Sequence, residues 1–419
     1  MRHDMRQRRV LSRSEPRYSM AFLLLGPALV IVLAMGVSAS GATIPRELAG
    51  VSVTHVVRAK PKPATRPAEV LSGTGVIRLG PHFEQASGYE RFTYVLVSRS
   101  DARKAARLPG TTLAYMSGTS VQREWSTGVT YREALANDWL LKDASGAYVM
   151  NVEFGAFVAD IGNPAYQRRF IANTLAFVKR TKIDGLFIDD VTGDPEAMSD
   201  VYPAKYPDPA AWEAAMVSFV QTVGKALKSR GYYVLANAAK WISDDSRSDT
   251  AFHTTEFWKR IAPGVSGLMT EYWLQSPLDH GELRVLGTDW DQYWNQWQRL
   301  VSVAQTSGVD FFGLTYGSSK DTRAMRYARA SFLLDWDGRG GALLYSITDR
   351  PDPYHPSWSR QLGKPVARKL ERTSGVWQRR YERGMVVVNA TNEPADVRVF
   401  EKVYTVGSGD AVFVSAPRS

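Results

Sequence analysis

The sequence predicts an α/β fold, a (β/α)8 TIM barrel followed by a small C-terminal β-sandwich-like domain. From about residue 80 onward, short apolar runs alternate with longer amphipathic stretches, which is typical of repeated βα units and a parallel sheet. The spacing is regular and no GxGxxG motif follows the first run, which favours a closed barrel over an open doubly wound sheet. After about residue 350 the apolar residues recur with period two, which predicts strands.

Residues 1–42 are expected to form a signal peptide or a signal anchor. Six arginines precede the uncharged apolar run from Met20 to Val37, and small residues follow it up to Ala42. A run of about 18 apolar residues also approaches the minimum for a transmembrane helix, so a cleaved leader and a retained membrane anchor are both open. Either interpretation places the rest of the chain outside the cytoplasm, secreted or periplasmic. Residues 43–79 are rich in Pro and Lys and are expected to form a linker.

The barrel is expected to span residues 80–350. Its eight predicted strands begin at Arg91, Thr111, Ala156, Asp184, Tyr232, Ser266, Asp310 and Gly340. Asn163 before Pro164 and Asp208 before Pro209 each predict a helix start, because a side-chain acceptor precedes a residue that needs no N–H partner. One stripe of the second helix should face the sheet, since apolar residues recur there at helical spacing. The stripe consists of Trp212, Met216, Phe219, Val223 and Leu227.

Residues 351–419 are expected to form a separate β-rich domain packed on the barrel. Its clearest feature is a hairpin of period two, with a turn at residues 382–384.

Composition excludes several classes of function. The net charge of +10 is concentrated in the N-terminal arginines, and no nucleic-acid-binding signature follows them, so a nucleic-acid partner is not expected. The chain has no Cys, which excludes disulfides and Cys-based zinc or redox chemistry. Its six His form no HExxH motif, and neither a Walker motif nor a GxSxG elbow is present. No metal or cofactor is therefore expected. The 12 Trp and 19 Tyr suit the stacking of sugar faces, although most aromatic residues in any protein belong to the core.

Candidate catalytic residues end the fourth and sixth predicted strands, because function in such a barrel sits at the carboxyl ends of the strands. Asp189 and Asp190 end the apolar run GLFIDDV, where adjacent carboxylates are costly unless they are used or neutralised. Glu271 ends the run MTEYW beside aromatic residues, where desolvation would raise its pKa and keep a proton available. Asp189 is preferred over Asp190, which should point away or into the next loop, but a bulge at the strand end would exchange the two.

The other polar and aromatic residues at these strand ends are candidates for binding substrate, each with an ordinary structural role as its alternative. They are Tyr115, Ser117, Asp160, Asn237, Tyr272, Trp273 and Tyr316. Most of them can hydrogen-bond hydroxyl groups, and Trp273 is a candidate stacking wall. Asp184 and Asp310 begin their strands and should therefore lie at the opposite face of the barrel, where charges serve capping and stability.

Several of these segments resemble known families. The run DGLFIDDV, preceded by ADIGNPAYQRRF, resembles the fourth strand of family 114 glycoside hydrolases and especially of related hypothetical bacterial families such as the group GHL15. TLAYMS, YYVLANAA, LMTEYW and the tail GVWQRRYERGMVVVNAT are similar to that group too, so the resemblance covers roughly residue 80 to the C-terminus. With the wider similarity to α-galactosidase-like barrels, it implies a nucleophile at Asp189 and an acid/base near Glu271. Family 114 often has a Glu shortly after strand two, where this chain reads AYMSGTS.

The expected function is hydrolysis of glycosidic bonds in an extracellular or cell-envelope polysaccharide by an Asp/Glu pair. The alternative is a barrel that binds glycans without cleaving them, as part of envelope or exopolysaccharide assembly. In both cases the partner is a carbohydrate polymer or oligosaccharide. The distance between the two carboxyl groups separates these hypotheses, because hydrolysis requires both of them on either side of one bond.

Overall fold

The structure is a computed structural model. It describes residues 77–80, 92–124, 128–151, 154–195, 199, 201–239, 247–271, 273–275, 284–285, 291–318, 320–347 and 362–417. The expected leader at residues 1–42 and the expected linker up to residue 76 lie outside this described part. Among the helices within these ranges, none is both long and apolar enough to cross a membrane.

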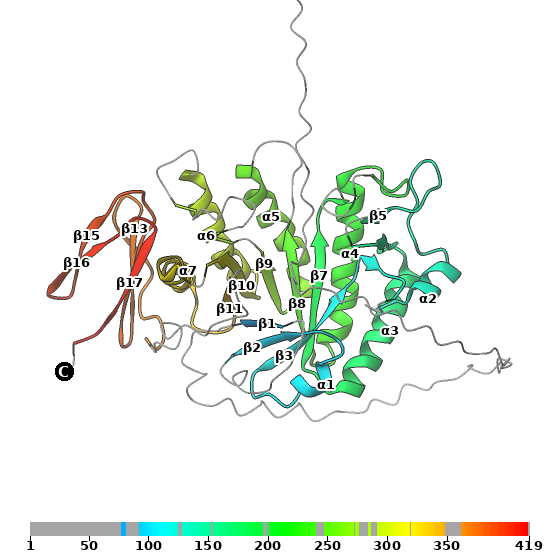
Figure 1. Ribbon diagram of the computed structural model, residues 1–419, viewed down its shortest axis with the longest axis horizontal. Helices are drawn as coiled ribbons and strands as arrows, with labels where there is room; N and C mark the ends of the chain where they lie inside the picture. Colours follow the sequence, from blue (N-terminus) through cyan, green and yellow to red (C-terminus); the bar gives the residue numbers. More distant parts are fainter. Residues whose placement is uncertain are drawn as a thin grey trace, which may run out of the picture.

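Eight parallel strands form the barrel sheet (Figure 1). Neighbouring strands follow one another along the chain, except that a segment with a small sheet of its own lies between the third and the fourth barrel strand. In sheet order they are β1 (Ile77–Gly80), β2 (Tyr94–Val97), β3 (Thr111–Ser117), β7 (Gly185–Thr192), β8 (Tyr233–Ala239), β9 (Gly267–Thr270), β10 (Asp310–Gly317) and β11 (Ala342–Ile347). The first strand also comes into contact with the last, so the sheet curls almost into a closed ring. The predicted TIM-barrel class is confirmed.

One predicted barrel strand is wrong and one barrel strand was not predicted, so the two errors cancel in the strand count. The first strand is Ile77–Gly80, which begins inside the segment expected to be linker. The run from Ala156 instead contributes β6 (Ala156–Val158) to a separate antiparallel sheet. Its apolar residues are buried as in a barrel strand, so composition alone does not distinguish the two positions. The strand that ends in Asp189 and Asp190 therefore remains the fourth, and the strand before Glu271 remains the sixth.

Helices cover the outside of the sheet. They are α1 (Ala102–Ala105), α3 (Pro164–Thr181), α4 (Pro209–Lys228), α5 (Arg247–Ile261) with the 3-10 turn η3 (Ala262–Gly264), α6 (Asp291–Thr306) and α7 (Thr322–Asp335). The two predicted starts are confirmed: Asn163 accepts a hydrogen bond from the N–H of Ala165, and Asp208 accepts one from the N–H of Ala211. The predicted stripe of α4 is buried along its whole length, which explains how this helix docks on the sheet.

An excursion between β3 and α3 carries a small sheet of its own. Its elements are β4 (Ser120–Val121), α2 (Tyr131–Ala136), β5 (Met150–Asn151) and β6. A capping box starts α2: Thr130 accepts a hydrogen bond from the N–H of Glu133, and the Glu133 carboxylate accepts one from the N–H of Thr130. The excursion leaves the barrel at the carboxyl end of β3, the end at which functional residues are expected.

The C-terminal domain consists of antiparallel strands in two sheets. One sheet has the order β12 (Leu370–Thr373), β13 (Val376–Tyr381), β14 (Gly384–Asn389) and β17 (Asp410–Ser415), and the other pairs β15 (Ala395–Val399) with β16 (Lys402–Val406). The predicted hairpin is confirmed, because residues 382–383 connect β13 to β14 with Tyr381 opposite Gly384. Buried Val residues fill the space between the two sheets, which makes the domain sandwich-like.

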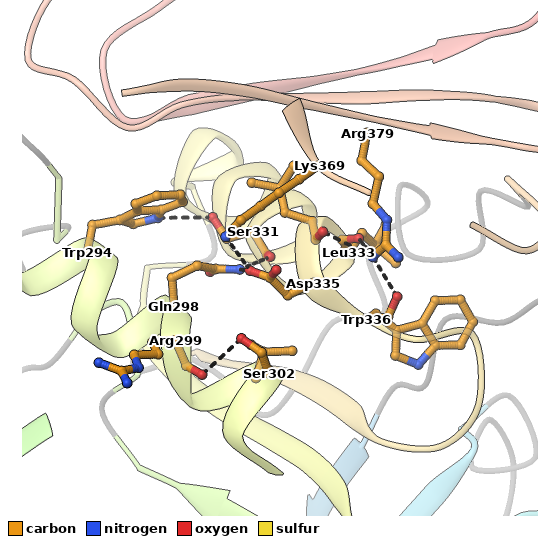
Figure 2. Close-up of polar contacts among 12 residues, drawn as sticks. Trp294, Gln298, Arg299, Ser302, Ser331, Leu333, Asp335, Trp336, Lys369 and Arg379 are labelled. Atoms are coloured by element: carbon orange, nitrogen blue, oxygen red, sulfur yellow. Dashed lines mark hydrogen bonds and ion pairs between the residues drawn. The ribbon is translucent and has the colours of Figure 1, made fainter. Parts of the chain in front are cut away.

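The domain is fixed to the barrel through α7, beside which it lies in Figure 1. Figure 2 shows Arg379 of β13 at the C-terminal end of this helix, where its Nη1 donates to the carbonyl oxygens of Leu333, Leu334 and Trp336 at 3.0, 3.0 and 2.6 Å. Lys369 pairs with Asp335 at 2.7 Å in the same region. A cation at this position donates to carbonyl oxygens that have no partner within the helix, and it interacts favourably with the helix dipole. The C-terminal domain therefore caps the C-terminal end of α7.

Candidate active site

The barrel interior is built in layers, and the candidate site is the layer at its carboxyl end. Apolar side chains from neighbouring strands pack together inside the barrel, among them Leu113, Phe187, Leu235, Met269 and Leu314. Two residues further along each chain segment come Tyr115, Asp189, Asn237, Glu271 and Tyr316. Side chains alternate between the two faces of a strand, so these five point the same way as the apolar layer below them. The sequence predicted all five as site residues.

Asn237 lies between the two predicted catalytic carboxyl groups. Its Nδ2 donates to Oδ1 of Asp189 at 2.9 Å and to Oε2 of Glu271 at 2.8 Å. Two oxygens that both bond to one nitrogen at these distances are at most about 6 Å apart. Asp189 and Glu271 are 4% and 3% exposed, so the pair is almost fully removed from water. The structure therefore brings together the two carboxyl groups that the sequence placed on separate strands.

Two tyrosines complete the hydrogen bonding of this pair. The hydroxyl of Tyr316 donates to Oε1 of Glu271 at 2.6 Å. Tyr115 hydrogen-bonds to Asp189, and the N–H of Asp190 also donates to that carboxylate. Both tyrosines pack against the apolar layer of the barrel interior, which fixes the position of their rings. Each carboxyl group is thus held from two sides.

Asp190 joins the site through an irregularity in β7. Its backbone is left-handed, with φ of 57°, and the pairing of β7 with β8 shifts register between Ile188 and Val191. Such a bulge redirects the residues that follow it, and Asp tolerates left-handed φ better than most residues. The Asp190 carboxylate accepts from the hydroxyls of Ser117 at 3.3 Å and Ser120 at 3.4 Å. The anticipated bulge is present, but it adds Asp190 to the site while Asp189 keeps its inward position.

Burial dominates the protonation of all three acidic groups. It raises the pKa of Glu271 to about 8, and the nearby charge of Asp189 adds to this effect, against the lowering effect of the Tyr316 and Asn237 hydrogen bonds. Burial also raises the pKa of Asp189, although Asn237, the N–H of Asp190 and Tyr115 act in the opposite direction. The pKa of Asp190 lies well above its usual range, because of burial and then of the charge on Asp189. The site therefore favours retention of protons at neutral pH.

The remaining predicted site residues have different positions. Ser117 is buried beside the carboxyl pair and bonds to Asp190. Asp160 bonds instead to Lys205 and to the hydroxyl of Tyr206, both at 2.5 Å, and anchors the segment before α4. Trp273 is fully buried between the sheet and the helices, where its Nε1 donates to the carbonyl of Trp297 at 2.9 Å, so its expected role as a stacking wall is wrong. Tyr272 lies outside the described residues.

Asp184 and Asp310 lie at the opposite end of the barrel, as predicted. Asp184 accepts from the N–H and the hydroxyl of Thr112, both at 2.8 Å. Asp310 accepts from the hydroxyl of Tyr233 at 2.7 Å, inside the barrel. Asp184 therefore joins the neighbouring strands β3 and β7, and Asp310 links β10 to β8 across the barrel interior, so both have a structural role at the amino ends.

Sequence reasoning missed the hydroxyl groups that follow β3. Ser120 bonds to Asp190, and the hydroxyl of Thr119 donates to the Asp190 carbonyl at 3.4 Å. The available signal is the cluster of hydroxyl residues directly after the end of β3.

A TIM barrel with two carboxyl groups at the ends of its fourth and sixth strands has the layout that glycoside hydrolysis requires. The chain belongs to the hypothetical glycosyl hydrolase family 15, whose model matches residues 112–385. A comparison with the curated proteins gave no match.

The solved structures that match this chain include the following three enzymes. A family GH31 sulfoquinovosidase from E. rectale is 12% identical, with a TM-score of 0.48 over 85% of this chain and 62% of that one. A maltogenic α-amylase from Thermotoga neapolitana is 10% identical, with a TM-score of 0.45 over 83% and 97%. An α-galactosidase from Lactobacillus brevis is 8% identical, with a TM-score of 0.42 over 82% and 55%.

Proposed function

We propose that this protein hydrolyses glycosidic bonds, with Asp189 as nucleophile and Glu271 as general acid. The observation that carries the proposal is the single amide of Asn237 holding both carboxyl groups within about 6 Å of each other. Retaining glycosidases place their carboxyl groups about 5–5.5 Å apart, whereas inverting enzymes need about 6.5–9.5 Å to admit a water molecule. The spacing favours the retaining route.

In that route Glu271 protonates the glycosidic oxygen while the bond from this oxygen to the anomeric carbon breaks. A carboxylate oxygen of Asp189 forms a bond to the same carbon, and the leaving sugar departs with the proton. Glu271, now ionised, then removes a proton from a water molecule, whose oxygen displaces Asp189 from the anomeric carbon. The product sugar forms and both carboxyl groups return to their starting state.

The surroundings of the two carboxyl groups support this division of roles. The pKa of Glu271 is raised to about 8 by burial and by the charge of Asp189, so Glu271 holds its proton at neutral pH. Asp189 accepts hydrogen bonds from Tyr115, Asn237 and the N–H of Asp190, and all three favour its ionised form. The raised pKa of Glu271 and the three donors to Asp189 therefore support Glu271 as the proton carrier and Asp189 as the ionised group.

The proposed substrate is a polysaccharide outside the cytoplasm or in the cell envelope. The arginine-rich start and the apolar run from Met20 to Val37 support export, with or without retention at the membrane. Aromatic and hydroxyl side chains at the carboxyl end of the barrel, such as Tyr115 and Tyr316, are suited to contact sugar hydroxyls. N-terminal sequencing of the exported protein would locate the leader, and full-length protein found soluble in the cytoplasm would contradict export.

A second candidate function is glycan binding without cleavage. The observation that favours it is the burial of both carboxyl groups, which leaves little of either accessible in this conformation. A binding barrel needs no proton transfer, so its affinity for a glycan would tolerate neutral replacements of Asp189 and Glu271 far better than turnover would.

The deciding experiment is hydrolysis of a panel of galactose-containing and amino-sugar polymers by the purified protein. If the proposal is right, Asp189→Asn and Glu271→Gln each lower turnover by about 10³-fold or more. The matched control is Asp310→Asn, which neutralises a half-buried carboxyl group at the other end of the same barrel. Glycan binding that survives both site replacements, with no hydrolysis by the parent protein, would support the second candidate.

A further inference from the structure

The amide of Asn237 has a restricted hydrogen-bonding capacity. An amide nitrogen carries two hydrogens and accepts nothing. Both hydrogens of Asn237 are used, one on Oδ1 of Asp189 and one on Oε2 of Glu271. The nitrogen therefore has no hydrogen left for a sugar, and only the amide oxygen of Asn237 can bond to a sugar hydroxyl, as an acceptor.

This restriction decides where the proton of Glu271 sits. Oε2 faces a group that can only donate, so Oε2 acts as an acceptor there, and a proton on Oε2 would find no acceptor in the Asn237 nitrogen. Oε1 lies 2.6 Å from the hydroxyl of Tyr316, which can donate to an ionised carboxylate or rotate and accept from a protonated one. The acid proton of Glu271 therefore belongs on Oε1, on the side of Tyr316.

We propose that Asn237 and Tyr316 are positioning residues that select Oε1 of Glu271 as the atom from which the proton is delivered to the glycosidic oxygen. The inference rests on the proposed function. Asn237 holds the non-reacting oxygen and at the same time keeps Asp189 in its ionised form. Tyr316 holds the reacting oxygen and receives its hydrogen bond until a substrate oxygen competes for the proton.

The charge environment of Glu271 gives the sign of the expected effect. In the described part of the chain, the titratable groups that interact with it are Asp189 and Asp190 on β7, Tyr115 on β3 and Tyr316 on β10. The Tyr316 and Asn237 hydrogen bonds lower the pKa of Glu271, while burial and the Asp189 charge raise it. Tyr316 can bond to both forms of Glu271, but its hydrogen bond to the ionised carboxylate is the stronger one, and the Asn237 amide also stabilises the charged form. Removing either group should therefore raise that pKa further.

The test is an infrared titration of the protonated carboxyl band, assigned to Glu271 by its absence from Glu271→Gln. Tyr316→Phe and Asn237→Ala should each raise the midpoint by about one pKa unit, since a hydrogen bond to a charged group contributes about 1.5 kcal/mol. The control is Tyr94→Phe, which removes a hydroxyl at the opposite end of the barrel interior. An unchanged midpoint in Tyr316→Phe, which removes only a hydroxyl and is expected to fold, would overturn the inference.

A kinetic measurement separates proton delivery from simple loss of shape. With aryl glycosides of the sugar identified in the polymer panel, Tyr316→Phe should slow substrates with poor leaving groups about tenfold or more beyond those with good ones. An equal loss on both kinds of substrate would assign Tyr316 a merely structural role and overturn the inference. Shifted midpoints in a protein that hydrolyses nothing would support the proton placement and contradict the proposed function, so the two failures can be told apart.

Discussion

The contact between Arg379 and the end of α7 predicts how strongly the C-terminal domain stabilises the barrel. In Arg379→Ala the carbonyl oxygens of Leu333, Leu334 and Trp336 lose their cationic donor. One nitrogen with two hydrogens can make about two full hydrogen bonds to these three oxygens. With a charged donor that is partly exposed, and with the interaction with the helix dipole, we expect a loss of about 2 kcal/mol in the free energy of unfolding.

The assay is thermal unfolding of the purified full chain, in which a loss of this size should lower the melting temperature by roughly 3–6 °C. The matched control is Arg380→Ala, because Arg380 is the next residue of the same strand and its side chain is exposed. Arg379→Lys should recover only part of the loss, since an ammonium group cannot reproduce the guanidinium geometry. A melting temperature for Arg379→Ala equal to that of Arg380→Ala would refute the reasoning.

Three further predictions concern the acidic groups. The value of kcat/KM should fall as the pH rises through about 8, where Glu271 loses its proton, and a profile that stays level to pH 9 would argue against Glu271 as the acid. The folded-state pKa of Glu271 lies above the ordinary value of 4.5, so the wild type loses stability as the pH rises from there to about 8. Glu271→Gln does not titrate, and its melting temperature should therefore exceed that of the wild type by more at pH 8 than at pH 5. Asp160→Ala should lower the free energy of unfolding by about 2–3 kcal/mol and leave KM unchanged, because the buried Tyr206 hydroxyl and Lys205 lose their acceptor. A raised KM with unchanged stability would instead indicate that Asp160 binds substrate.

The parts of the fold that local chemistry determines could be predicted from the sequence. Asn163 and Asp208 mark helix starts because their side chains cap the next turn, and no distant contact is needed to recognise them. The pair Asp189 and Glu271 could be found because strand ends in a barrel meet at one face. The short strand at Ile77–Gly80 could not, since four residues give too little periodicity to separate a strand from a linker.

The wrong and missing site residues depend on where the chain leaves a strand. Trp273 follows Glu271 by two residues, which predicts the same direction, but β9 already ends at Thr270. The N–H of Trp273 bonds to the carbonyl of Leu314 while its side chain turns into the core. The left-handed backbone of Asp190 likewise depends on tertiary partners, since the hydroxyls that hold its carboxylate come from another strand end.

The excursion after β3 bears on attempts to redesign what this barrel accepts. Its root, residues 117–120, is tied to Asp190 by three hydroxyl groups, so mutations there would disturb the acidic groups themselves. Its outer turn at residues 144–148 is solvent-exposed. A combinatorial library in this excursion would therefore randomise the outer turn and keep the root constant, so that the acidic groups keep their surroundings while the excursion is varied.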